Sequence, residues 1–127
     1  MAEPNHPLST KRIFARAWSD TIAFLQATLG GSGIRTFLAP GNHDWIGPES
    51  PYAQGGWSEN VTIFREDHLV PVELADGVTL WGAAHRAPAN TDDFFADFRV
   101  DRSGINLVVA HASEQSALLV QGDRKLP

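Results

Sequence analysis

The sequence contains no cysteine, which excludes a disulfide framework and any metal site built from thiolates. It also lacks an apolar run near the ~20 residues that a membrane-spanning helix needs. Positive charge is scarce: 10 Lys and Arg residues stand against 15 Asp and Glu residues, and the net charge is −5. A general attraction to nucleic acid is therefore not expected, and a bound polyanion would need metal ions to offset the local charge.

Length and composition are those of a small globular protein. The chain has 127 residues, of which 43% are hydrophobic and 20% charged, so we expect a single domain, or part of one, over residues 1–127. Residues 1–7 are polar and contain two prolines, unlike a signal peptide. A cytoplasmic protein is the default expectation.

One long helix is expected in the N-terminal part. Ser9 or Thr10 caps its start, and it continues to about Leu29, where a cluster of glycines follows. Apolar residues at spacings of three and four form one stripe along it: Phe14, Trp18, Ile22, Leu25 and Leu29.

Five strands and a short helix are expected after it, which makes the fold class α/β, a mixed sheet with flanking helices. An Asp-Gly turn at residues 76–77 joins two of the strands as a hairpin. Asn90 or Thr91 caps the short helix. The apolar runs at 34–39 and 105–110 indicate strands buried on both faces. The expected strands are residues 34–39, 60–64, 69–74, 78–83 and 105–110.

Three polar residues follow the first of these apolar runs. The dipeptide Pro-Gly ends the run and turns the chain. Asn42, His43 and Asp44 come next, just past the carboxyl end of the strand, where ligands bind in open α/β sheets. An amide oxygen suits Mn²⁺ or Mg²⁺, an imidazole can coordinate a metal or transfer a proton, and a carboxylate can orient a histidine. The same residue types also form ordinary turns, so a purely structural loop is the alternative.

His111 repeats this placement at the end of the second apolar run. If the two strands are parallel neighbours, Asn42 and His111 face one crevice. A lone histidine after a strand is more often structural, but beside the polar loop a metal ligand is the preferred interpretation. We expect His85, which follows another strand, to be structural or to face a substrate. His6 and His68 are not expected to take part.

The tetrapeptide Gly-Asn-His-Asp at residues 41–44, placed after a hydrophobic strand, resembles a signature motif of the calcineurin-like metallophosphoesterases. The resemblance implies that Asn42 binds one ion of a two-metal centre. It also implies that His43 faces the scissile phosphate without binding metal, and that Asp44 orients His43.

Residues 108–111, Val-Val-Ala-His, are similar to the family's next motif, which implies that His111 binds the same ion as Asn42. The hairpin and the following Trp81-Gly82 resemble the layout of the SbcD-type DNA exonuclease branch. That branch implies metal-dependent hydrolysis of phosphodiester bonds in DNA repair, by a homodimer with an SbcC-type ATPase partner. The two ions would be Mn²⁺, with Mg²⁺ or iron as alternatives.

The family's other motifs are missing. Asp-x-His does not occur, Gly122-Asp123 is not followed by Asp three residues later, and there is no Gly-His pair. We therefore expect a partial metallophosphoesterase sandwich, incomplete at both ends, that is inactive alone and binds Mn²⁺ poorly. A degenerate homologue is the alternative.

Other functions stay open. A general phosphatase or a cyclic nucleotide phosphodiesterase would use the same centre, and a non-catalytic module would keep the fold for partner binding. The loop at residues 45–58, rich in glycine, proline and aromatic residues, is a candidate substrate wall. Alternatively, its aromatic residues only cover the edge of the core.

Overall fold

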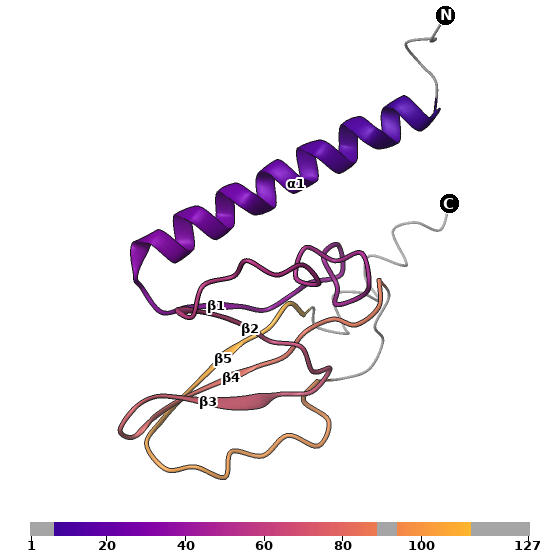
Figure 1. Ribbon diagram of the computed structural model, residues 1–127. Coiled ribbons are helices and arrows are strands. Elements are labelled where there is room, and N and C mark those ends of the chain that lie inside the picture. Colours follow the sequence, from indigo (N-terminus) through magenta and orange to yellow (C-terminus); the bar gives the residue numbers. More distant parts are fainter. Residues whose placement is uncertain (1–6, 89–93, 113–127) are drawn as a thin grey trace, which may run out of the picture. The chain divides into compact units, whose positions relative to one another are not determined.

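The computed structural model describes residues 7–88 and 94–112, with side chains placed from residue 16 onward. The long helix, the hairpin and the five expected strands are present, with shifted ends, and one sheet is mixed, as expected for the α/β class. No described helix is both long enough and apolar enough to pass through a membrane. Figure 1 labels the elements: α1 (Pro7–Ser32), β1 (Thr36–Leu38), β2 (Val61–Ile63), β3 (Val70–Ala75), β4 (Val78–Gly82) and β5 (Ile105–Val109).

The chain forms two compact units. The first contains Met1–Leu38 and Ile46–Ile63, and the second contains Ala39–Trp45 and Phe64–Pro127. The single domain expected over residues 1–127 stays a prediction.

In the first unit, hydrogen bonds of Asn60 connect the end of α1 to the start of β1. The side-chain Nδ2 of Asn60 donates to the carbonyl oxygens of Leu29 at 2.9 Å and Ile34 at 2.8 Å. The N–H of Thr36 donates to the Asn60 carbonyl at 2.8 Å. Carbonyls in the last turn of a helix lack intrahelical partners, so Asn60 satisfies one of them. Beyond these bonds, β1 and β2 pair in parallel.

The helix ends at a glycine, as predicted, but later than expected. Gly30 and Gly31 keep a helical backbone, and α1 continues to Ser32. Gly33 then adopts a φ of 68°, the left-handed conformation that usually follows a helix C-terminus. Local sequence predicted the type of stop, but not which of the glycines provides it.

The prediction of a short helix after Asn90 or Thr91 is wrong for residues 94–98, which the structure describes. Residues 94–97 form a single turn, in which the N–H of Phe98 donates to the carbonyl of Phe95 at 3.1 Å. Residues 89–93, including the expected cap, lie outside the described residues. Phe94 and Phe98 pack against the buried cluster of Leu69, Trp81 and Ala83, so their apolar side chains serve a turn rather than a helix.

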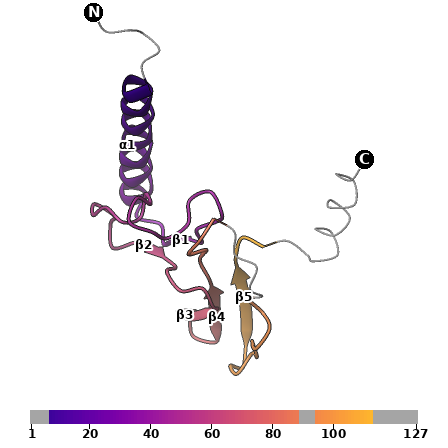
Figure 2. The ribbon, with the colours of Figure 1, turned by 90° about the vertical axis from the view of Figure 1, so that its right-hand side faces the viewer.

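The second unit contains a three-stranded mixed sheet in the order β3-β4-β5. β3 pairs with β4 as the predicted antiparallel hairpin, and Gly77 in its turn has a φ of 73°. β4 pairs with β5 in parallel, and Figure 2 shows these two strands beside each other. β4 is the central strand, and four of its five residues are buried.

The prediction that both apolar runs are buried on both faces is wrong. β1 is half-buried, and Ile34 just before it is 68% exposed. In β5, Ile105 is 59% and Leu107 46% exposed. A parallel strand is buried on both faces when helices cover both sides of its sheet, and the second unit contains no described helix. An apolar run therefore predicted the strand but not its covering.

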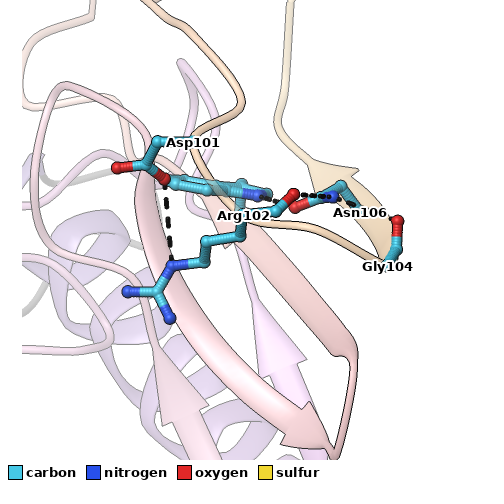
Figure 3. A network of polar contacts seen from close by, with 5 residues as sticks. Asp101, Arg102, Gly104 and Asn106 are labelled. Carbon is cyan, nitrogen blue, oxygen red and sulfur yellow. Dashed lines mark hydrogen bonds and ion pairs between the residues drawn. The ribbon is translucent and has the colours of Figure 1, made fainter.

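A polar network centred on Asn106 holds the segment that leads into β5 (Figure 3). The indole Nε1 of Trp81 donates to Asn106 Oδ1 at 2.9 Å, and Asn106 Nδ2 donates to the carbonyl of Arg102 at 3.0 Å. The Arg102 guanidinium lies 5.8 Å from the centroid of the Trp81 ring. Because a buried indole N–H needs an acceptor, Asn106 both satisfies Trp81 and fixes the loop beside β4.

Gly104 is predicted to tolerate a side chain poorly. Its φ is 90°, and a Cβ there would collide with the Gly77 carbonyl, which accepts the Ile105 N–H at 2.8 Å. Gly77 has a similar φ of 73° but open space around it. We expect Gly104→Ala to lower the free energy of unfolding by about 3 kcal/mol and Gly77→Ala by about 1 kcal/mol. Urea unfolding followed by tryptophan fluorescence measures both, and equal losses would contradict the collision.

Candidate functional site

Two histidines come together where β4 and β5 end. The parallel register pairs Gly82 with Val109, so the carboxyl ends of both strands lie at the same edge of the sheet. His85 follows β4 and His111 follows β5, and the centroids of their rings are 5.3 Å apart at an interplanar angle of 68°. The pairing of these strands thus brings two distant histidines to one place.

The polar loop after β1 reaches the same place by a different route from the one expected. The strands before Asn42 and His111 are not parallel neighbours, which was the condition for a shared crevice, because β1 pairs with β2 and β5 pairs with β4 in separate sheets. The segment Ala39–Trp45 nevertheless belongs to the same compact unit as β4 and β5. The main-chain N–H of His85 donates to the carbonyl of the buried Pro40 at 3.0 Å.

Gly41 is in contact with His111. A Cβ built on Gly41 would lie 3.0 Å from Cγ and 3.2 Å from Nδ1 of His111, and 3.3 Å from Oδ1 of Asp44. The imidazole of His111 and the carboxylate of Asp44 therefore approach the same small space above Gly41. The structure thus places the residue before Asn42 directly against the second predicted metal ligand.

Asp44 folds back over its own loop. Its Oδ1 accepts a hydrogen bond from the N–H of Gly41 at 2.8 Å, which closes a turn of the kind that Asp commonly stabilises. Asn42 and Asp44 are half-buried, and His43 is exposed. The loop at residues 41–44 therefore contains a turn that Asp44 stabilises, as the structural alternative expected. The roles predicted for Asn42 as a ligand, His43 at the phosphate and Asp44 in orienting His43 stay predictions.

His85 is buried, with 8% of its surface exposed. Its Nε2 lies 2.7 Å from the carbonyl oxygen of His111, and its ring meets that of Phe94 edge to face at 5.2 Å between centroids. Its Nδ1 is buried and has no hydrogen-bond partner among the described residues. Sequence reasoning gave His85 no defined partner. The missing signal was the pairing of β4 with β5, which local patterns do not encode.

The remaining candidates add little to this cluster. His68 is exposed, and its Nδ1 lies 3.4 Å from Asp67, while His6 lies outside the described residues. Tyr52 and Trp57 of the glycine-rich loop pack on each other with ring centroids 5.9 Å apart, in the first compact unit. Whether this loop is a substrate wall or a cover for the core stays a prediction.

The donors available for a metal are few. Among residues 7–88 and 94–112, no three His, Cys, Asp or Glu side chains are grouped so that they could hold an ion. The predicted pair of Asn42 and His111 consists of two neutral donors, which suit one face of a site for Mn²⁺ but do not balance its charge.

Gly41→Ala is expected to displace the His111 imidazole. The added methyl would sit 3.0 Å from His111 Cγ, and because His111 is exposed its ring can move aside. The carbon-bound ring protons of His111 should therefore shift in NMR spectra. Gly55→Ala, where a Cβ meets nothing within 4 Å, is the control, and unchanged His111 signals in Gly41→Ala would disprove the contact.

Comparison of the chain with family models, with curated proteins and with solved structures finds no match in any of the three.

Proposed function

We propose that this chain carries part of the catalytic centre of a metal-dependent phosphoesterase of the calcineurin-like type. Asn42 and His111 would bind one divalent ion, Mn²⁺ by preference, and His43 would face the scissile phosphate. The observation that supports this most is the contact between Gly41 and the His111 imidazole. Two segments with ligand-type residues, far apart in the sequence, meet there.

The exposure of the residues fits this assignment. His43 and His111 are exposed and Asn42 is half-buried, so all three are open to an ion and an anionic substrate entering from solvent. The Asp44 carboxylate beside Gly41 adds a negative charge that favours a cation nearby. Both proposed ligands are neutral, so further carboxylates are needed to bind two dications tightly.

The residues divide the chemistry between them. Bound divalent ions would polarise the phosphate oxygens and activate the attacking water. His43 would donate a proton to, or stabilise charge on, the leaving oxygen. The hydrogen bond from the Gly41 N–H to Asp44 keeps the loop closed, which holds Asn42 and His43 at fixed positions in it.

The substrate class proposed is a phosphodiester, with DNA as the first candidate. A net charge of −5 provides no general attraction for a polyanion, so recognition would depend on the ions. A homodimer, an SbcC-type ATPase partner and a cytoplasmic location complete the proposal. A non-catalytic module is the second candidate, because no three His, Cys, Asp or Glu side chains of the described residues are grouped so that they could hold an ion.

Metal binding tests the two ligands. We expect Mn²⁺ titration of this chain by calorimetry to show weak binding only, and Asn42→Ala and His111→Ala each to weaken it at least about 10-fold further. His68→Ala, which removes an exposed histidine paired with Asp67, is the control and should leave the affinity unchanged. Two tight sites in the unaltered chain, or no effect of either variant, would refute the assignment.

Turnover tests the role of His43. In a form of the domain that carries the full ligand set, His43→Ala should lower kcat by about 10²–10⁴-fold while metal content stays unchanged, because His43 acts on the substrate and not on the ions. Single-stranded DNA and a chromogenic phosphodiester as parallel substrates separate a nuclease from a general phosphoesterase. Loss of metal in His43→Ala would make His43 a ligand instead.

A further inference from the structure

His85 contacts all three segments that form the candidate site. It follows β4, its main-chain N–H donates to the carbonyl of Pro40 before the polar loop, and its ring reaches the carbonyl of His111 after β5. We propose that His85 is a positioning residue, which sets where the His111 imidazole stands relative to the loop. This inference rests on the proposed function for the role of His111 as a metal ligand. The hydrogen bonds and ring contacts of His85 do not depend on that function.

The hydrogen bond to His111 determines the tautomer of His85. A carbonyl oxygen can only accept, so the Nε2 that lies 2.7 Å from the His111 oxygen must carry the proton. In the neutral ring, Nδ1 then holds a lone pair, and this atom is buried without a partner in the part of the chain that the structure describes. His85 therefore uses Nε2 to hold the main chain of His111, and that nitrogen is not available to a metal ion.

Burial separates His85 from the substrate. Only 8% of the residue is exposed, and its ring is packed edge to face against Phe94 and His111, with centroids 5.2 Å and 5.3 Å away. A side chain enclosed in this way cannot contact a large phosphodiester directly. Its influence on the site has to pass through the residues that it holds.

His111 needs such an anchor because it lies beyond the sheet. The last residue of β5 that is paired with β4 is Val109, and His111 is exposed. Past the end of a ladder the main chain is no longer fixed by strand pairing. A hydrogen bond to the carbonyl of the ligand residue itself restores that constraint, and precise placement of ligands requires support of this kind.

The same residue fixes the other side of the contact. The bond from the His85 N–H to Pro40 holds the residue next to Gly41, while the bond from His85 Nε2 holds His111. One residue thus sets the separation of Gly41 and His111, which is so small that a Cβ added to Gly41 would lie 3.0 Å from His111 Cγ. Any residue except proline can supply the main-chain bond, but the bond to His111 needs a side-chain donor at the position of Nε2.

Two substitutions separate this role from simple packing. In His85→Gln the amide nitrogen is as many bonds from Cα as Nε2 of histidine, so it can donate to the His111 carbonyl. In His85→Asn the amide nitrogen matches Nδ1 instead and falls short. Both variants remove the aromatic ring, so packing loss is common to them. His68→Gln, at an exposed histidine, is the control for altering a histidine elsewhere.

The first readout is NMR spectroscopy, and its first part needs no variant. Long-range ¹H–¹⁵N spectra of the unaltered chain should show His85 as the Nε2–H tautomer. Because both substitutions remove the ring that packs on His111, the His111 amide and ring signals should shift in both variants, but by more in His85→Asn than in His85→Gln. They should stay near their original positions in His68→Gln. A His85 in the Nδ1–H form, or equal spectra for the Gln and Asn variants, would overturn the proposal.

A second readout separates this inference from the proposed function. Traces of Mn²⁺ should broaden the signals of Asn42 and His111 in the unaltered chain and in His85→Gln, but His111 much less in His85→Asn. If Mn²⁺ broadens neither residue in the unaltered chain, the metal-ligand assignment fails, while the tautomer and the His111 shifts still decide the role of His85. Broadening of His111 that is equal in the Gln and Asn variants would overturn the positioning role alone.

Discussion

The parallel pairing of β4 with β5 is the constraint on which the candidate site depends. It aligns Gly82 with Val109, and this alignment is why His85 and His111 leave the sheet at the same edge. From there the N–H of His85 donates to Pro40 and its ring bonds to the His111 carbonyl, and the His111 imidazole lies beside Gly41. Slipping this pairing by one residue would reverse the face on which every β5 side chain lies.

The elements of the fold were predictable because each has a local cause. The Asp-Gly turn at residues 76–77 specified the hairpin, and glycines after Leu29 specified a helix end. The covering of strands was not predictable, since the same apolar run serves a strand between helices and a strand left partly open. Ile34 and Ile105 were expected to be buried and are exposed for this reason.

In the candidate site, too, the sequence predicted some features and not others. The residue types at 42–44 and at 111 indicated where chemistry could occur, and the structure brings Gly41 against His111. The expected route, through neighbouring strands of one sheet, was wrong, and a loop held by His85 takes its place. Sequence spacing carries no information on a hydrogen bond between a buried ring and a carbonyl 26 residues away, so the part played by His85 could only come from coordinates.

The open side of β5 has a consequence for handling the protein. No described strand pairs with its second edge, and the strand reads Ile-Asn-Leu-Val-Val, without charge or proline. Natural sheets protect such edges with charge, proline or a bulge, and an unprotected edge adds strands from other molecules. Where such an edge is left uncovered, intermolecular β-aggregation in concentrated solutions begins there, and a lysine placed outward on β5 is the simplest remedy for solubility.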